Sequence, residues 1–174
     1  MNFSHFINSQ TGLIHFIASV FALGFGTAVL YMTKGTKKHR LIGKLYSYSM
    51  FILLATAFMT YQLFGKWGIF HYTATISVLT ILGGLIPLYF KTWYKDYIVV
   101  HFGFMYWSVM GLYAAFASEM FIRIPKVVTV KGVPNYLFYN MSALGSFFVI
   151  GIGMYFYLKL RPTWVKQFSK IDAN

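Results

Sequence analysis

The sequence predicts an all-α integral membrane protein built from five transmembrane helices. Its composition is the first reason: 58% of the 174 residues are hydrophobic, only 10% are charged, and the mean hydropathy is +0.61. These values lie far outside the range of soluble domains, which need more polar surface to cover their core. The second reason is the presence of five apolar segments of about 20 residues, the length that crosses the hydrocarbon core. We therefore expect a single transmembrane domain over residues 1–174.

The five segments follow one another with short connections. Their predicted limits are 10–32, 45–64, 68–90, 97–121 and 136–158. Because short connections make consecutive helices antiparallel neighbours, we expect spans one to four to form an up-and-down bundle.

The basic residues predict the orientation of these spans. Of the 15 Lys and Arg residues, eleven fall on one side of the membrane if all five segments cross it. These are Lys34, Lys37, Lys38, Arg40, Lys44, Lys91, Lys95, Lys159, Arg161, Lys166 and Lys170. Cytoplasmic connections collect Lys and Arg, so the N-terminus is expected outside and the C-terminus inside. We expect the membrane to be a bacterial inner (cytoplasmic) membrane.

Two features of the composition exclude whole classes of function. The chain has no cysteine, which rules out disulfides, iron–sulfur clusters and the covalent attachment of a c-type haem. The net charge of +12 comes from residues at span ends that form no basic helix face. Attraction to an anionic leaflet explains this charge, and we expect no binding of nucleic acid.

Four histidines sort into two predicted levels within the membrane. His15 and His71 lie near the outer ends of spans one and three, and His39 and His101 lie near the inner ends of spans two and four. Alternate helices of a four-helix bundle face each other across the core, which is the geometry that holds a planar cofactor between two imidazoles. The glycines at 24–26, 83–84 and 151–153 either open a cavity for it or allow close helix packing.

This pattern predicts a small membrane redox protein that carries electrons through b-type haem. Haem b needs only axial side-chain ligands and a cavity. His15 with His71 and His39 with His101 are the expected cofactor-binding pairs, and Arg40 is expected to contact a propionate. The bilayer and a quinol or another electron donor are the expected partners.

Two alternatives remain open at this stage. His15, His71 and Glu119 are candidate ligands of zinc, copper or iron in a metal-dependent membrane enzyme or metal-handling protein, although Glu119 also stands four residues before Arg123, as in a helix ion pair. In the other alternative the histidines only form hydrogen bonds between helices. The protein would then be a non-catalytic subunit or assembly factor of a membrane complex with other membrane subunits.

Three stretches carry a resemblance to a known group. They are His15 in a glycine-containing first span, the segment HRLIGKLY that begins at His39, and His101 followed by Met105, Ser108 and Glu119. These stretches resemble a widespread group of predicted bacterial membrane proteins of unknown function. The resemblance implies a compact helical membrane domain with a paired role for its histidines. The arrangement of the histidines is also similar to that of transmembrane di-haem cytochromes b.

Overall fold

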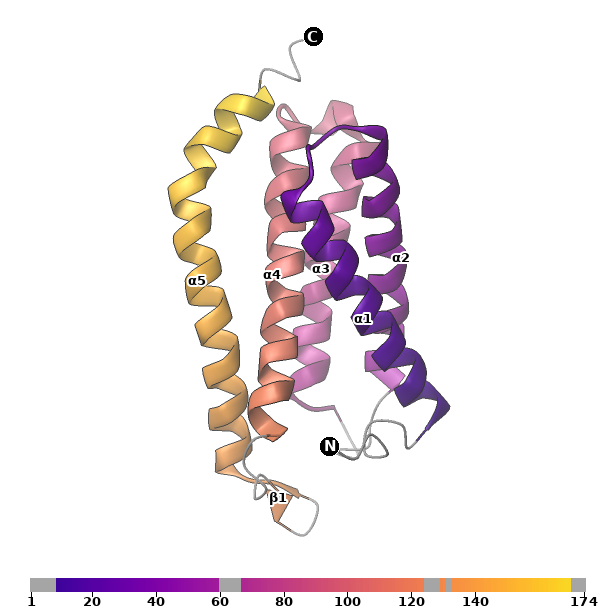
Figure 1. Cartoon of the computed structure of the whole chain (residues 1–174), viewed down its shortest axis with the longest axis vertical. Helices are drawn as coiled ribbons and strands as arrows, with labels where there is room; N and C mark the ends of the chain where they lie inside the picture. The colour runs from indigo at the N-terminus through magenta and orange to yellow at the C-terminus, as the bar shows by residue number, and fades with distance from the viewer. Residues whose placement is uncertain (1–8, 60–66, 124–128, 131–132, 170–174) are drawn as a thin grey trace. The chain divides into compact units, whose positions relative to one another are not determined.

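The computed structural model describes residues 9–59, 67–123, 129–130 and 133–169. Within this part of the chain lie five long helices, one short 3₁₀ helix and one small hairpin (Figure 1). The elements are α1 (Gln10–Tyr31), α2 (Lys37–Met59), α3 (Ile69–Tyr89), η2 (Lys91–Trp93), α4 (Tyr97–Arg123), β1 (Thr129–Val130), β2 (Val133–Pro134) and α5 (Tyr136–Ser169). All five α-helices are long and apolar enough to cross a membrane, which confirms the predicted number and apolar character of the helices.

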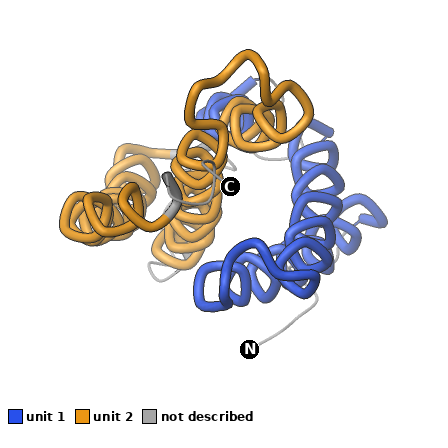
Figure 2. Tube along the Cα trace, turned by 90° about the horizontal axis from the view of Figure 1, so that it is seen from above, with its two compact units in different colours: residues 1–76 blue, residues 77–174 orange. Residues whose placement is uncertain are grey.

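The contacts divide the chain into two compact units, residues 1–76 and 77–174, and their boundary falls inside α3 (Figure 2). In the first unit α1 packs along α2, and in the second α4 packs along α5. Both pairs are consecutive in the sequence and run antiparallel. The bundle of spans one to four, the single domain and the sides on which the two termini lie stay predictions.

Helix α2 begins eight residues before the predicted span, at Lys37 rather than Leu45. The Thr36 side chain explains this start, because its Oγ1 accepts a hydrogen bond from the His39 N–H at 3.1 Å, as an N-cap residue does. Lys37 and Lys38 therefore lie at the positive end of the helix dipole, which costs about 0.3–1 kcal/mol for each charge. Both side chains are exposed, so solvent and salt screen this cost.

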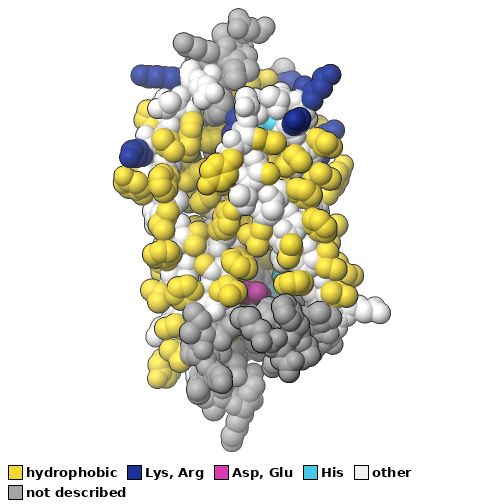
Figure 3. Space-filling model, in the orientation of Figure 1, with side chains coloured by type: hydrophobic (Ala, Val, Ile, Leu, Met, Phe, Trp, Pro, Cys, Tyr) yellow, Lys and Arg dark blue, Asp and Glu magenta, His cyan; other side chains and the backbone are white. Residues whose placement is uncertain are grey.

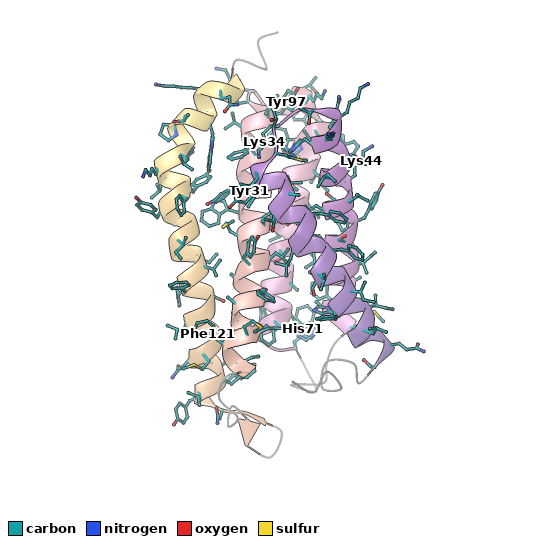
Figure 4. All side chains as sticks on the ribbon, viewed as in Figure 1. Tyr31, Lys34, Lys44, His71, Tyr97 and Phe121 are labelled. Atoms are coloured by element: carbon teal, nitrogen blue, oxygen red, sulfur yellow. The ribbon has the colours of Figure 1, made fainter. Side chains whose placement is uncertain are left out.

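The side chain of Lys34 closes the C-terminal end of α1 (Figure 4). Its Nζ donates hydrogen bonds to the carbonyls of Val29, Leu30 and Met32, at 2.7, 2.6 and 3.1 Å. These carbonyls belong to the end of the helix, where backbone acceptors lose their intrahelical partners. The next residue, Gly35, has a φ of 77° and turns the chain towards α2. Only glycine adopts this conformation without strain.

We expect Lys34→Met to lower the free energy of unfolding by about 1 kcal/mol, because it leaves helix-terminal carbonyls without these donors. Burial lowers the pKa of the Lys34 amine in the folded protein. At pH values between this lowered pKa and the ordinary pKa of lysine, the unfolded chain therefore binds more protons than the folded chain. The stability of the wild type relative to Lys34→Met should therefore rise with pH in this window. Unfolding in mild detergent at several pH values tests this. Lys37→Met, which removes an exposed lysine, should have no such effect.

Small residues line the buried face of α1. Ala18, Ala22 and Gly26 are buried at intervals of four residues, while Tyr46 and Met50 are buried on α2. Small side chains let two helices approach closely, which is how helices associate in lipid. On the face shown in Figure 3, apolar side chains cover most of the described helix surface, whereas Lys and Arg lie near helix ends. Such a surface suits a lipid bilayer.

Helix α5 continues to Ser169, whereas the predicted span ended at Leu158. Asn135 caps the start of this helix, because its Oδ1 accepts a hydrogen bond from the Phe138 N–H at 3.1 Å. Pro162 lies inside the helix and does not end it. With 34 residues the helix is about 51 Å long, longer than the roughly 30 Å of the hydrocarbon core. Its last turns therefore extend beyond the apolar part of the membrane.

Candidate functional site

His101 makes the closest interhelical polar contact among the predicted ligands. It lies in the second turn of α4, and its Nδ1 is 2.6 Å from the Gly84 carbonyl of α3. A carbonyl oxygen only accepts, so Nδ1 carries the proton and the Nε2 of a neutral ring carries the lone pair. This is the arrangement of histidines that ligate metals, which donate their second ring N–H to a carbonyl or carboxylate.

Glycines on α3 allow this contact. A Cβ on Gly84 would lie 2.6 Å from the Met105 Sδ, and a Cβ on Gly83 would lie 2.7 Å from the Phe104 ring. Any larger residue at 83 or 84 would push α4 away from α3. These two glycines therefore serve helix packing, and the side chains of α4 fill the space that a cavity would occupy.

His15 makes the second contact between helices. Its Nδ1 is 3.0 Å from the Thr56 Oγ1 on α2. The single hydroxyl proton of Thr56 is directed to the carbonyls of Ile52 and Leu53, both at 2.9 Å. We therefore assign the proton of this contact to His15 Nδ1, which again leaves the lone pair of a neutral ring on Nε2.

In His71 the roles of the two ring nitrogens are reversed. It is only 2% exposed, and its Nδ1 accepts a hydrogen bond from the Gly68 N–H at 3.1 Å. The His71 N–H in turn bonds to the Gly68 carbonyl. Gly68 is the residue before α3 and His71 is the third residue of the helix, so the ring takes the place of the Glu or Gln in a capping box. In a neutral ring the proton is then on Nε2, which does not suit an Nε2 ligand.

The outer histidines both reach the last turns of α2. His15 contacts Thr56, and the His71 ring lies 6.5 Å from the Phe58 ring and 5.2 Å from the Trp67 ring. The two side chains thus lie at the same end of the first unit, where Figure 4 labels His71.

The predicted inner pair is divided between the units. His39 is half-buried in the first turn of α2, and Arg40 beside it is exposed. His101 belongs to the second unit. The pairing of His39 with His101, and the contact of Arg40 with a propionate, stay predictions.

Of the three predicted metal ligands, His15 and His71 belong to the first unit and Glu119 to the second, so their metal site stays a prediction. Across residues 9–59, 67–123, 129–130 and 133–169, no group of three His, Asp or Glu side chains is arranged to hold a metal ion. Glu119 is half-buried on α4. Its predicted ion pair involves the side chain of Arg123, which lies outside the described part.

An aromatic cluster that the sequence reasoning missed joins α4 to α5. Ring centroids lie 4.7 Å apart for Phe102 and Trp164, 5.7 Å for Tyr106 and Trp164, and 5.3 Å for Tyr106 and Tyr157. The Tyr106 hydroxyl also donates to the Gly153 carbonyl at 2.7 Å. Tyr157 and Trp164 are seven residues apart, a spacing that places both on one helix face and was the available signal.

Thr56 and the capping role of His71 were also missed. The signal for the second was Gly68-x-x-His71 directly before an apolar run, which has the spacing of a capping box.

Comparison with known proteins gives no relative from which a function could be transferred. No protein-family model matches the sequence, and no curated protein or solved structure is significantly similar to the chain.

Proposed function

We propose that this protein transfers electrons in the membrane through a b-type haem that His101 would help to hold. The observation that carries the proposal is the 2.6 Å contact between His101 Nδ1 and the Gly84 carbonyl. It holds the ring in one orientation, gives Nε2 the lone pair and raises its basicity, as outer partners do for ligating histidines.

The residues of the second unit near His101 are apolar, and Phe104 and Met105 would have to shift from Gly83 and Gly84 to make room for a haem. Ile81 on α3 is fully buried, and Met105, one turn after His101, is 8% exposed. Both side chains are apolar and lie within one helical turn of the two residues in the His101–Gly84 contact. Haem would supply the one-electron couple, and the low polarity of these neighbours is one of the factors that set its potential. His39 remains the proposed second ligand, Arg40 the proposed contact of a propionate, and a quinol the proposed class of electron donor.

We propose one haem for each chain instead of the two predicted from the histidine pattern. The outer pair fits poorly, because His71 Nδ1 accepts the Gly68 N–H and the proton of its neutral ring is then on Nε2. A ligating His71 would have to turn its ring and give up the cap of α3.

A second candidate function is favoured by the capping bond of His71 and by the contact of His15 with Thr56. Both bonds hold helices in place without any cofactor. In that case the protein is a non-catalytic subunit or assembly factor of a membrane complex.

The two functions differ in the visible spectrum of the purified protein. If haem is bound at His101, protein produced with ample haem should show a Soret band and a sharp α-band on reduction, at one haem for each chain. His101→Ala should remove most of this absorbance. His71→Ala should keep it and lower the free energy of unfolding by about 1 kcal/mol, the typical contribution of a helix cap.

The haem content of the wild type and the variants distinguishes between these proposals. Absence of a Soret band from the wild type would reject the haem proposal and favour the structural role. Two haems in the wild type and one in His71→Ala would restore the outer pair. Equal haem content in the wild type and His101→Ala would reject His101 as the ligand.

A further inference from the structure

We propose that the last turns of α5 form a binding site for an anionic phospholipid, with Arg161 and Lys166 contacting the phosphate. This segment, residues 159–169, is here named the basic extension. It follows the predicted end of the fifth span at Leu158, so it lies at the level of the lipid headgroups. The proposal is independent of any haem.

The aromatic cluster fixes the orientation of the basic extension within the second unit. Trp164 is half-buried and packs on Phe102 and Tyr106 of α4. Tyr157, two turns earlier on the same face, packs on Tyr106. Since this face is held against α4, the opposite face of the extension is turned away from the protein. Tryptophan and tyrosine are also the residues that favour the headgroup level.

The basic extension carries charge beside apolar side chains. The Arg161 guanidinium lies 5.9 Å from the centroid of the Tyr157 ring, so Arg161 borders the aromatic cluster, whereas Pro162 and Lys166 lie on the outward face. A shallow groove is lined by Arg161, Pro162, Val165 and Lys166, and both basic side chains are exposed. Arg161 and Val165 are four residues apart, as are Pro162 and Lys166, so each cation stands one helical turn from an apolar side chain. This combination matches a phospholipid, whose phosphate is anionic and whose glycerol and first acyl carbons are apolar.

Further basic residues near the groove add to its positive electrostatic potential. Lys159 is exposed on the preceding turn, and Lys91 and Lys95 lie in the connection before α4, whose first turns adjoin Trp164. The only opposing charge in that connection is Asp96, and the sequence of α5 contains no Asp or Glu. Clusters of basic residues next to a transmembrane helix attract anionic lipids, and arginine binds phosphate through two parallel hydrogen bonds.

The test uses the full chain in a neutral detergent and measures the retention of lipid by native mass spectrometry. The probes are phosphatidylglycerol and phosphatidylcholine of equal chain length, titrated separately. We expect the wild type to bind phosphatidylglycerol more tightly. The double variant Arg161→Gln/Lys166→Gln should weaken that binding at least about tenfold, because it removes the charge-assisted hydrogen bonds of both side chains to the phosphate. Binding of phosphatidylcholine should stay unchanged.

The matched control is Lys37→Gln/Lys38→Gln, which removes the same charge from the start of α2. If both double variants lose the same affinity for phosphatidylglycerol, net charge alone attracts the lipid and the proposal is overturned. Equal affinity of the wild type for the two lipids would do the same. Competition by inorganic phosphate at the concentration of the lipid would indicate a site for free phosphate. An unchanged unfolding midpoint without lipid confirms that the variants fold.

Discussion

Replacing Gly145 by alanine should separate α4 from α5 and lower the free energy of unfolding by about 2–3 kcal/mol, in the range of overpacked cores. A Cβ at this position would lie 2.8 Å from the Ala117 carbonyl oxygen and 2.9 Å from the Ser118 nitrogen. Both are backbone atoms, so no side chain can rotate away to make room. The helices must move apart instead.

Polar contacts between α4 and α5 lie next to Gly145. The Ser118 hydroxyl lies 2.8 Å from the Ser142 carbonyl oxygen and 2.6 Å from the Ser146 hydroxyl. A shift of α5 would stretch these hydrogen bonds, each of which contributes roughly 0.6–2 kcal/mol in membrane proteins. The steric effect and the loss of hydrogen bonds therefore act in the same direction.

Gly151 provides the control, because a Cβ there meets nothing within 4 Å. Gly151→Ala should leave stability unchanged or raise it by up to about 1 kcal/mol, the difference in helix propensity. Denaturant or thermal unfolding in mild detergent, followed by circular dichroism, measures both variants. If Gly145→Ala is as stable as Gly151→Ala, the close contact at Ala117 does not exist in the membrane protein.

Replacing Tyr46 by alanine should have the second large effect, a loss of roughly 3 kcal/mol. Tyr46 is 0% exposed and belongs to the buried face of α2, with Met50 at 1% and Leu53 at 7%. Truncation leaves a cavity at this buried face. Because lipid is also apolar, most of this loss comes from packing contacts and little from transfer out of water.

Tyr48, two residues further along the same helix, is the matched control. It is 64% exposed, so Tyr48→Ala should change the free energy of unfolding by no more than about 0.5 kcal/mol. The two variants have the same composition and differ only in the helix face that loses the ring. Equal stability of the two would contradict the packing of α1 against α2.

The contrast between these tyrosines also marks a limit of sequence reasoning. Both lie near the start of the predicted second span, where tyrosines favour the membrane surface, yet Tyr48 is exposed and Tyr46 is buried. In water the buried face of a helix is recognised because its other face is polar. In lipid both faces are apolar, so the pattern along α2 does not reveal which side packs on α1.

The number of helices and most of their limits were predictable from the sequence. The predicted spans 10–32 and 68–90 agree closely with α1 and α3, because span length and hydropathy are local properties set by the thickness of the bilayer. The errors occur where a helix continues into polar sequence. Hydropathy falls before Leu45 and after Leu158, yet the Thr36 cap extends α2, and packing of Trp164 on α4 accompanies the continuation of α5.

The roles of the histidines were decided by the tertiary structure alone. Sequence distance identified four histidines at span ends, but a ring nitrogen donates or accepts according to the atom that faces it. The Gly84 carbonyl faces His101, and the Gly68 N–H faces His71. These partners come from a neighbouring helix and from a helix start. The composition of the chain therefore determined its membrane class, and the contacts between backbone and side chains decided which ring nitrogen of His71 and His101 donates or accepts a hydrogen bond.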